Sequence, residues 1–274
     1  MPALFECVIN LSTGRREEVE RFSEHSGGSL CDVHRDEHHN RSVYTLIAER
    51  DQLSADVRRL IEAAMEDLDI REHVGVHPRL GVVDVVPFVA LGEQPFEAAV
   101  ALRDETGAWI AASFQTPVFY YGPLADGSQR TLPEIRQRAF ATLAPDVGPP
   151  APHPSRGASA VGARGVLVAW NLWVRGITLD EGRAIARAIR GDVVRALAFP
   201  VGEFVQISCN LVEPERVGPA DVYDQVAALL PEGAFDHAEL VGLVPAALLE
   251  RVPRERWVEL DLSPERTIEA HEGR

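Results

Sequence analysis

The sequence is poor in positive charge, which limits the partners it can have. Its 274 residues include 27 lysines and arginines against 42 aspartates and glutamates, a formal net charge of −15. Nucleic acids and anionic membranes bind to basic faces, and an acidic surface repels them. The composition therefore predicts neither a nucleic-acid partner nor membrane binding, although a few local arginines can still hold a small anion.

Cysteines and long apolar runs are scarce as well. The three cysteines, Cys7, Cys31 and Cys209, lie far apart in apolar stretches, which predicts buried free thiols instead of disulfides or a paired zinc site. Charges, prolines or glycines interrupt every apolar run before it could span a bilayer, and the N-terminal sequence does not resemble a signal peptide. We therefore expect a cytoplasmic protein.

What the chain has is a repeated order of secondary structure. Hydrophobic periodicity in the first half predicts strand, helix, strand, strand, helix, strand, and the second half repeats this order from 166 to 245. Between the halves we expect a helix at 95–114, a strand at 117–121, a helix at 131–143 and then a Pro/Gly-rich connection. The sequence thus predicts an α+β fold of two ferredoxin-like βαββαβ units, divided as residues 1–147 and 148–274.

The stretch "HVGVHPRLGVVDVVPF" (73–88) contains the first candidate for chemistry. His77 precedes a proline, which favours extended backbone, so it is expected in a loop at the mouth of a strand. Gly75 and Pro78 interrupt the helical turn that would bring His73 and His77 onto one metal, and we therefore predict no metal site. General acid–base work suits a loop histidine, with Asp84 able to orient it; a loop-stabilising hydrogen bond is the alternative.

Two further segments are candidates for binding. In the Gly148–Gly157 region prolines keep the backbone extended and glycines allow a ligand to approach, but such a segment can equally be an interdomain linker. The polar "HRDEHHNR" stretch (34–41) reads as a solvated loop between strands, with a three-histidine metal site as the alternative. At its end, Asn40 and Arg41 re-enter a strand where their side chains can face a cleft.

Several of these stretches together resemble one family. "ECVINLSTGR", "HNRSVYTL", "HVGVHPRLGVVDVVPF", "HPSRGASAVGAR", "VQISCNL" and "ELVGLVP" occur in the order found in the formiminotransferase domain of glutamate formiminotransferases, and the likeness extends from about Glu6 to Leu249. The resemblance implies two α/β subdomains, a homodimer, and transfer of a formimino group from N-formimino-L-glutamate to N5 of the co-substrate tetrahydrofolate.

The resemblance also implies roles for particular residues. His77 matches the family's acid–base catalyst, and Arg41, Arg79 and Asn40 are candidates for binding the substrate's carboxylates, with surface ion pairs as the alternative for the arginines. The segment that matches the folate-binding stretch comprises Gly148, Pro149, Pro150, Ala151, Pro152, His153, Pro154, Ser155, Arg156 and Gly157.

The chain departs from the family pattern in ways that leave other functions open. Val76 stands where the family has a glutamate, and the region from Ile189 to Gln206 is shorter than in the family. Formyl transfer, or metabolism of 5-formyltetrahydrofolate, differs from formimino transfer by one atom at the migrating carbon. A non-catalytic paralogue that binds folate or an acidic ligand is the alternative from another class.

Overall fold

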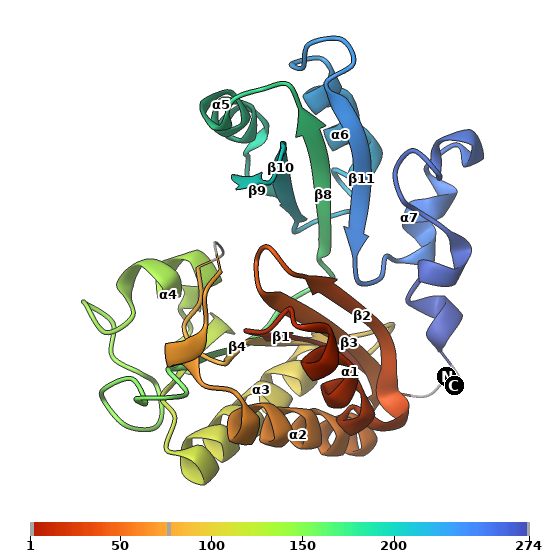
Figure 1. The fold of residues 1–274 in the computed structure, drawn as a ribbon. Coiled ribbons are helices and arrows are strands. Elements are labelled where there is room, and N and C mark those ends of the chain that lie inside the picture. The colour runs from red at the N-terminus through yellow and green to blue at the C-terminus, as the bar shows by residue number, and fades with distance from the viewer. Residues whose placement is uncertain (1–2, 76–77, 273–274) are drawn as a thin grey trace. The chain divides into compact units, whose positions relative to one another are not determined.

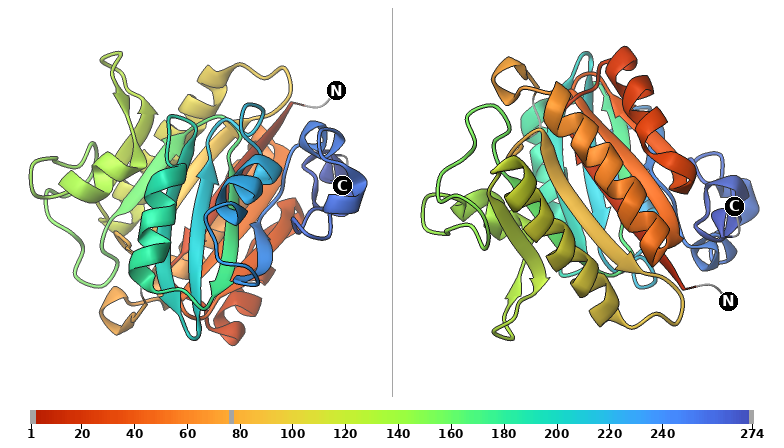
Figure 2. Two further views of the ribbon diagram at one scale, coloured as in Figure 1. Left: turned by 90° about the horizontal axis from the view of Figure 1, so that it is seen from above. Right: turned by 90° about the horizontal axis from the view of Figure 1, so that it is seen from below.

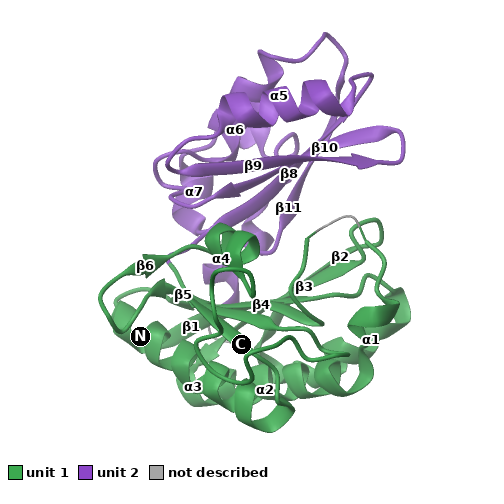
Figure 3. Cartoon of the chain, turned by 90° about the vertical axis from the view of Figure 1, so that its left-hand side faces the viewer, with its two compact units in different colours: residues 1–164, 272–274 green, residues 165–271 purple. Residues whose placement is uncertain are grey.

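The computed structural model describes residues 3–75 and 78–272, and these divide into two compact units (Figure 3). Unit 1 ends at Arg164, and unit 2 runs from Gly165 to His271. Each unit contains its own hydrophobic core. No helix in the described ranges combines the length and the apolar character needed to cross a lipid bilayer.

The described residues of unit 1 form a sheet of seven strands in the order β2-β3-β1-β4-β7-β5-β6. The first four strands are antiparallel, whereas β7 pairs in parallel with both β4 and β5. The elements in chain order are β1 (Leu4–Leu11), α1 (Arg16–His25), β2 (Leu30–Asp36), β3 (Arg41–Glu49), α2 (Arg50–Asp67), β4 (Val83–Ala90), α3 (Phe96–Phe114), β5 (Val118–Pro123), β6 (Gln129–Arg130), α4 (Leu132–Arg138) and β7 (Ser159–Ala163).

Helices α1, α2 and α3 cover one face of this sheet (Figures 1 and 2). Side chains alternate along a strand, so Cys7, Ile9 and Leu11 of β1 point into the core beneath these helices and are fully buried. The residues between them, including Asn10, face the opposite side of the sheet. On that side, Ile135 of α4 belongs to a smaller apolar cluster with buried residues of β4, β5 and β7. One face is thus closed by a large core, and the other carries polar residues.

Unit 2 is a sheet of four strands in the order β11-β8-β10-β9, with every pair antiparallel. Thr178 caps the first helix and exchanges hydrogen bonds with Glu181, the reciprocal arrangement that its sequence spacing indicates. The elements are β8 (Val168–Arg175), α5 (Leu179–Ile189), β9 (Val194–Val201), β10 (Phe204–Leu211), α6 (Pro219–Ala227), β11 (Phe235–Val241) and α7 (Ala246–Glu250).

The predicted fold class is confirmed. Both units contain a βαββαβ segment whose fourth strand lies beside the first and whose third lies between first and second, which is the ferredoxin-like arrangement. The short region from Ile189 to Gln206 forms β9 and a tight hairpin to β10, where Val201 pairs with Phe204 and Gly202 takes a φ of +59°. The shortening therefore leaves a complete sheet.

Three local features differ from expectation. The units divide after Arg164 instead of after 147, because β7 pairs with β4 and β5 and so belongs to the first sheet. The sequence analysis assigned β7 to a connection, since small residues give a weak strand signal. Apolar spacing in the sequence predicts that the second helix begins behind a cap at Ser54. Helix α2 begins at Arg50, four positions earlier, because Leu53 is buried in the core and adds a turn to the apolar face.

Candidate active site

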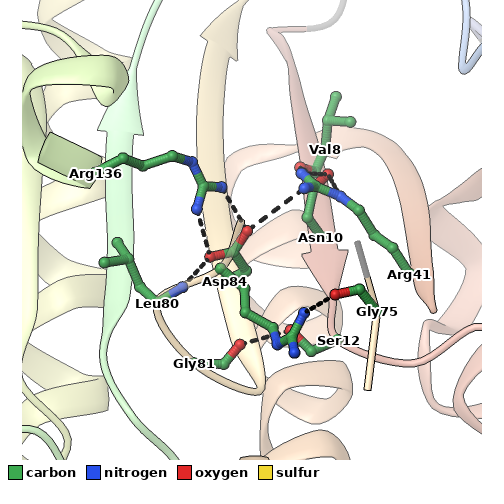
Figure 4. Close-up of polar contacts among 10 residues, drawn as sticks. Val8, Asn10, Ser12, Arg41, Gly75, Leu80, Gly81, Asp84 and Arg136 are labelled. Carbon is green, nitrogen blue, oxygen red and sulfur yellow. Dashed lines mark hydrogen bonds and ion pairs between the residues drawn. The ribbon is translucent and has the colours of Figure 1, made fainter. Parts of the chain in front are cut away.

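A group of polar side chains lies on the face of the unit 1 sheet opposite α1, α2 and α3. Asn10 of β1 accepts hydrogen bonds from Nε of Arg41 at 3.0 Å and from its Nη2. Its own amide nitrogen donates to the carbonyl oxygen of Val8 at 2.9 Å, which fixes the orientation of the amide group. Figure 4 shows that Arg41, from the first position of β3, points toward the carboxylate of Asp84 on β4. Three neighbouring strands thus converge on one ionic cluster.

Asp84 is the centre of this cluster. Arg136 of α4 donates to both carboxylate oxygens, at 3.3 Å and 2.6 Å, while Nη1 of Arg41 lies 3.6 Å from Oδ2 (Figure 4). The backbone N–H of Leu80 donates to Oδ1 at 2.7 Å. The Asp84 side chain is only 3% exposed. Each of these donors helps to fix the position of the others.

Burial dominates the electrostatics of the arginines in this cluster. Burial is the main cause that lowers the pKa of Arg41 to about 10; Asp84 and Asp36 oppose the lowering and Arg136 adds to it. Arg41 therefore stays protonated near neutral pH. Burial also lowers the pKa of Arg79, and the charge of Asp84 opposes this shift. Arg41 and Arg136 thus form ion pairs with Asp84, and Arg79 interacts with it electrostatically.

A small pocket opens beside the cluster, entirely within unit 1. Its volume is about 170 Å³ including the space open to solvent. The pocket is lined by Ser12, His39, Asn40, Arg41, His73, Arg79 and Asp84. Its walls therefore combine two guanidinium groups, two imidazoles, an amide, a hydroxyl and the carboxylate of Asp84, a set that suits a small polar ligand with hydrogen-bonding groups.

His73 and Arg79 line one side of the pocket, and pocket residues hold the described backbone at 73–75. Asn40 donates to the carbonyl oxygen of Val74 at 3.0 Å and accepts from the N–H of Gly14 at 2.7 Å. Arg79 donates to the carbonyl oxygens of His73 and Gly75, both at 3.3 Å (Figure 4 for Gly75). Asn40 takes a φ of +48°, which asparagine tolerates better than most residues. Both side chains thus fix the flanks of the loop.

The structure brings three of the predicted substrate-binding residues together in one pocket, whereas the predicted catalytic residue is not among the described residues. Asn40, Arg41 and Arg79 line one pocket. His77 lies outside the described residues, between the described Gly75 and Pro78, so its role stays a prediction.

The segment 148–157 divides into two parts. Gly148, Pro150, Ala151 and Pro152 are exposed, whereas Gly157 is buried and forms a β-bridge with Gly81. A Cβ on Gly157 would lie 2.3 Å from the carbonyl oxygen of Leu80, so only glycine allows this close approach.

The side chains of Arg156 and His153 form hydrogen bonds with backbone groups of unit 1. Arg156 donates through Nε to the carbonyl oxygen of Met65 near the end of α2, at 2.7 Å. His153 accepts from the N–H of Arg156 at 3.1 Å. Neither residue lines the pocket. The predicted folate contacts of His153 and Arg156 stay a prediction.

The histidine-rich loop has no metal-binding arrangement in the described part of the chain. No group of three or more histidine, cysteine, aspartate or glutamate side chains there could hold a metal ion. His39 instead packs against its neighbour Asp36, with Nε2 3.7 Å from the carboxylate, while His38 is exposed. The loop's contribution to the pocket is His39 together with the two residues that follow it.

Several residues of the site are not predicted by the sequence, among them Asn10, Ser12, His73 and Arg136. Arg136 lies in α4, 52 positions along the chain from its partner Asp84, and no local pattern connects the two. His73 was considered only as a metal ligand. Its sequence position, close to His77 in a glycine-containing loop, was a usable signal, but its hydrogen bond to Ser12 joins residues 61 positions apart.

Comparison of the sequence with known proteins identifies one family. Residues 4–164 match the family model described as the formiminotransferase domain, N-terminal subdomain, which ends where unit 1 ends. The chain is 32% identical to the glutamate formimidoyltransferase of Thermoplasma acidophilum, with 90% of each chain covered. It is 28% identical to the glutamate formimidoyltransferase of Streptococcus pyogenes, with 91% of each covered, and 30% identical to the formimidoyltransferase-cyclodeaminase of Sus scrofa, covering 91% of this chain and 51% of that protein.

Proposed function

Because the chain belongs to the formiminotransferase family, we propose that it is a transferase that moves the formimino group of N-formimino-L-glutamate to N5 of tetrahydrofolate. The observation that carries this proposal beyond family membership is the cationic pocket on unit 1. Arg41 and Arg79 line this pocket, guanidinium groups pair well with carboxylates, and the donor substrate has two carboxylates.

The composition of the pocket supports a carboxylate ligand. Arg41 and Arg79 line the pocket, and guanidinium groups form charge-assisted hydrogen bonds with carboxylates. We infer that a substrate carboxylate binds beside Arg41, whose position Asn10 and Asp84 fix in advance.

The acid–base step is assigned to His77 from the resemblance. When N5 attacks the formimino carbon it must lose a proton, and the departing glutamate nitrogen must gain one. A histidine with a pKa near neutrality can do both, contributing on the order of 10²–10⁴-fold in rate. Arg79 and Asn40 hold the described flank of the loop that carries His77. We therefore assign them to positioning this loop more than to direct contact with substrate.

Tetrahydrofolate supplies the accepting nitrogen. The exposed prolines and glycine at 148–152 are the part of the predicted folate segment that a second substrate can reach. This segment continues into backbone hydrogen bonds with the catalytic loop region, since the N–H of Val82 donates to Arg156 and that of Ala158 donates to Leu80, each at 3.0 Å. These hydrogen bonds join the folate segment to residues 80–82, which follow Arg79 of the pocket in the chain.

A direct assay tests the proposal. Purified protein is mixed with tetrahydrofolate and N-formimino-L-glutamate, and formation of 5-formiminotetrahydrofolate and glutamate is followed spectrophotometrically and by mass spectrometry. We expect turnover that requires both substrates. If no product forms above background, calorimetric titration with each substrate separately shows whether the chain only binds them, which would favour the non-catalytic paralogue.

A further inference from the structure

Arg136 reaches the ionic cluster from outside the pocket. It lies in α4, a helix whose start is fixed by reciprocal hydrogen bonds between Thr131 and Glu134. The preceding residue, Ile135, is fully buried in the apolar cluster with β4, β5 and β7 and anchors the helix on the sheet. The side chain of Arg136 is 18% exposed, and Arg136 is not among the residues that line the pocket. Any effect of Arg136 on a pocket ligand therefore acts through another residue or through its charge.

The residue that connects Arg136 to the pocket is Asp84. Arg136 faces its carboxylate with two donors, Nη1 to Oδ1 at 3.3 Å and Nη2 to Oδ2 at 2.6 Å, which is the forked geometry that arginine adopts with carboxylates (Figure 4). The N–H of Leu80 also donates to Oδ1, at 2.7 Å. Both oxygens of this buried carboxylate thus accept hydrogen bonds from groups that do not line the pocket.

Arg41, which does line the pocket, forms no hydrogen bond with Asp84. Its Nη1 is 3.6 Å from Oδ2, beyond hydrogen-bond distance, whereas its Nε and Nη2 donate to Oδ1 of Asn10 (Figure 4). The same Oδ2 of Asp84 is only 2.6 Å from Nη2 of Arg136. The two arginines thus compete for one oxygen atom, and Arg136 has the shorter contact.

We propose that Arg136 is a positioning residue for Arg41: by occupying the carboxylate of Asp84, it prevents Arg41 from closing onto Asp84 and leaves it oriented for a substrate carboxylate. The inference rests on the proposed function, in which Arg41 binds the donor, and extends the site to α4. A buried carboxylate is costly to leave without donors, so in the absence of Arg136 the guanidinium 3.6 Å away would move in to bond it. Arg41 would then have fewer donors for the substrate.

The first test measures KM and kcat for N-formimino-L-glutamate at saturating tetrahydrofolate. Arg136→Gln should raise KM about fivefold to tenfold and leave kcat within about twofold of wild type, because a charge-assisted hydrogen bond to the substrate is weakened while the reacting groups stay in place. Arg138→Gln removes the same charge from the same helix and is the matched control. Arg138 is exposed and donates to Oγ1 of Thr142 at 3.3 Å, so both constants should remain at their wild-type values.

Two further variants separate positioning from charge and from structural damage. Arg136→Lys keeps the charge but loses the forked pair of donors, so KM should stay raised at least about threefold. A wild-type KM in this variant would mean that only the charge of Arg136 matters, which overturns the positioning role. Asp84→Asn combined with Arg136→Gln removes the carboxylate that would capture Arg41, so KM should fall back toward wild type. Structural damage would accumulate instead, and a double variant whose KM is as high as that of Arg136→Gln contradicts the proposal.

The outcomes distinguish this inference from the proposed function. Wild-type turnover with an unchanged KM in both Arg136→Gln and Arg136→Lys overturns the positioning role alone. If wild-type protein binds the donor without transferring it, the proposed function is overturned, and calorimetric Kd values of the same variants test the role of Arg136. Wild-type protein that neither binds nor transfers the donor overturns both. If Arg136→Gln does not fold, Arg136→Lys keeps a cation beside Asp84 and provides the comparison, and an unchanged KM there is decisive against positioning.

Discussion

The two units share one strand order but differ on the face that the helices leave open. In unit 1, Asn10 of the central strand accepts hydrogen bonds from Arg41, and the surrounding cluster is cationic. In unit 2, Asn171 of the equivalent strand β8 donates to a carboxylate oxygen of Glu239 at 3.0 Å, which also accepts from Trp173 at 2.9 Å. A repeated fold thus carries opposite polar chemistry, as expected when function resides in sites and not in the fold.

The connection before the fourth strand accounts for much of this difference. In unit 1 residues 68–82 separate α2 from β4, and this stretch contains His73, His77 and Arg79. In unit 2 only residues 228–234 separate α6 from β11. Unit 1 also continues into α4, which supplies Arg136. The candidate site therefore depends on a lengthened loop and an added helix that unit 2 does not have.

The largest effect is expected when the chemistry of the long loop is removed. His77→Ala should lower kcat by about 10²–10⁴-fold, because the assigned proton acceptor and donor is lost while the carboxylate pocket remains. KM for the formimino donor should change little. Steady-state kinetics with both substrates varied measure this, and His237→Ala in unit 2 is the matched control. A kcat within a few-fold of wild type would contradict the acid–base role.

Removing the centre of the ionic cluster should mainly affect stability. Asp84→Asn leaves Arg41 and Arg136 buried without their shared counter-ion, which should lower the free energy of unfolding by about 3–5 kcal/mol. Glu239→Gln in unit 2 keeps an acceptor for Asn171 and Trp173, and is expected to cost about 1 kcal/mol or less. Urea unfolding compares the two. If both substitutions lower the free energy of unfolding equally, the ionic cluster of unit 1 contributes no more to stability than the Glu239 hydrogen bonds of unit 2.

The charge asymmetry between the units predicts an effect on substrate binding. Arg41→Gln removes a cation from the pocket and should raise KM for N-formimino-L-glutamate about tenfold or more with a smaller change in kcat, since a charge-assisted hydrogen bond contributes about 1.5–3 kcal/mol. Arg175→Gln, in unit 2, serves as the control. If both substitutions raise KM equally, the donor is not recognised by the unit 1 pocket specifically.

The smallest effect concerns pH. Because burial lowers the pKa of His73, the unfolded chain takes up its proton first as the pH falls below about 6.5, and the free energy of unfolding should decrease until the folded protein is protonated too. His73→Gln should flatten this part of the stability curve. Denaturant unfolding between pH 5 and 7.5 measures the difference. An unchanged slope in His73→Gln would show that His73 is not buried in its neutral form.

Local pattern was sufficient for most of the fold. Alternation around Cys7, Ile9 and Leu11 predicts a half-buried strand, and the Thr178–Glu181 pair predicts a helix start, because both signals act over a few residues. The same reasoning missed β7. Its small residues carry little strand propensity, and only pairing with β4 and β5 stabilises it there.

The sequence by itself determined the fold class, the acidic background and the two segments, 34–41 and 73–88, that contain Asn40, Arg41, His77 and Arg79. Only the tertiary structure decided that Arg136 joins Asp84 and that Nδ1 of His73 lies 2.8 Å from the carbonyl oxygen of Ser12. The physical reason is distance along the chain. Periodicity and capping are properties of neighbouring residues, whereas an ion pair or hydrogen bond between distant residues exists only once the strands and helices have packed.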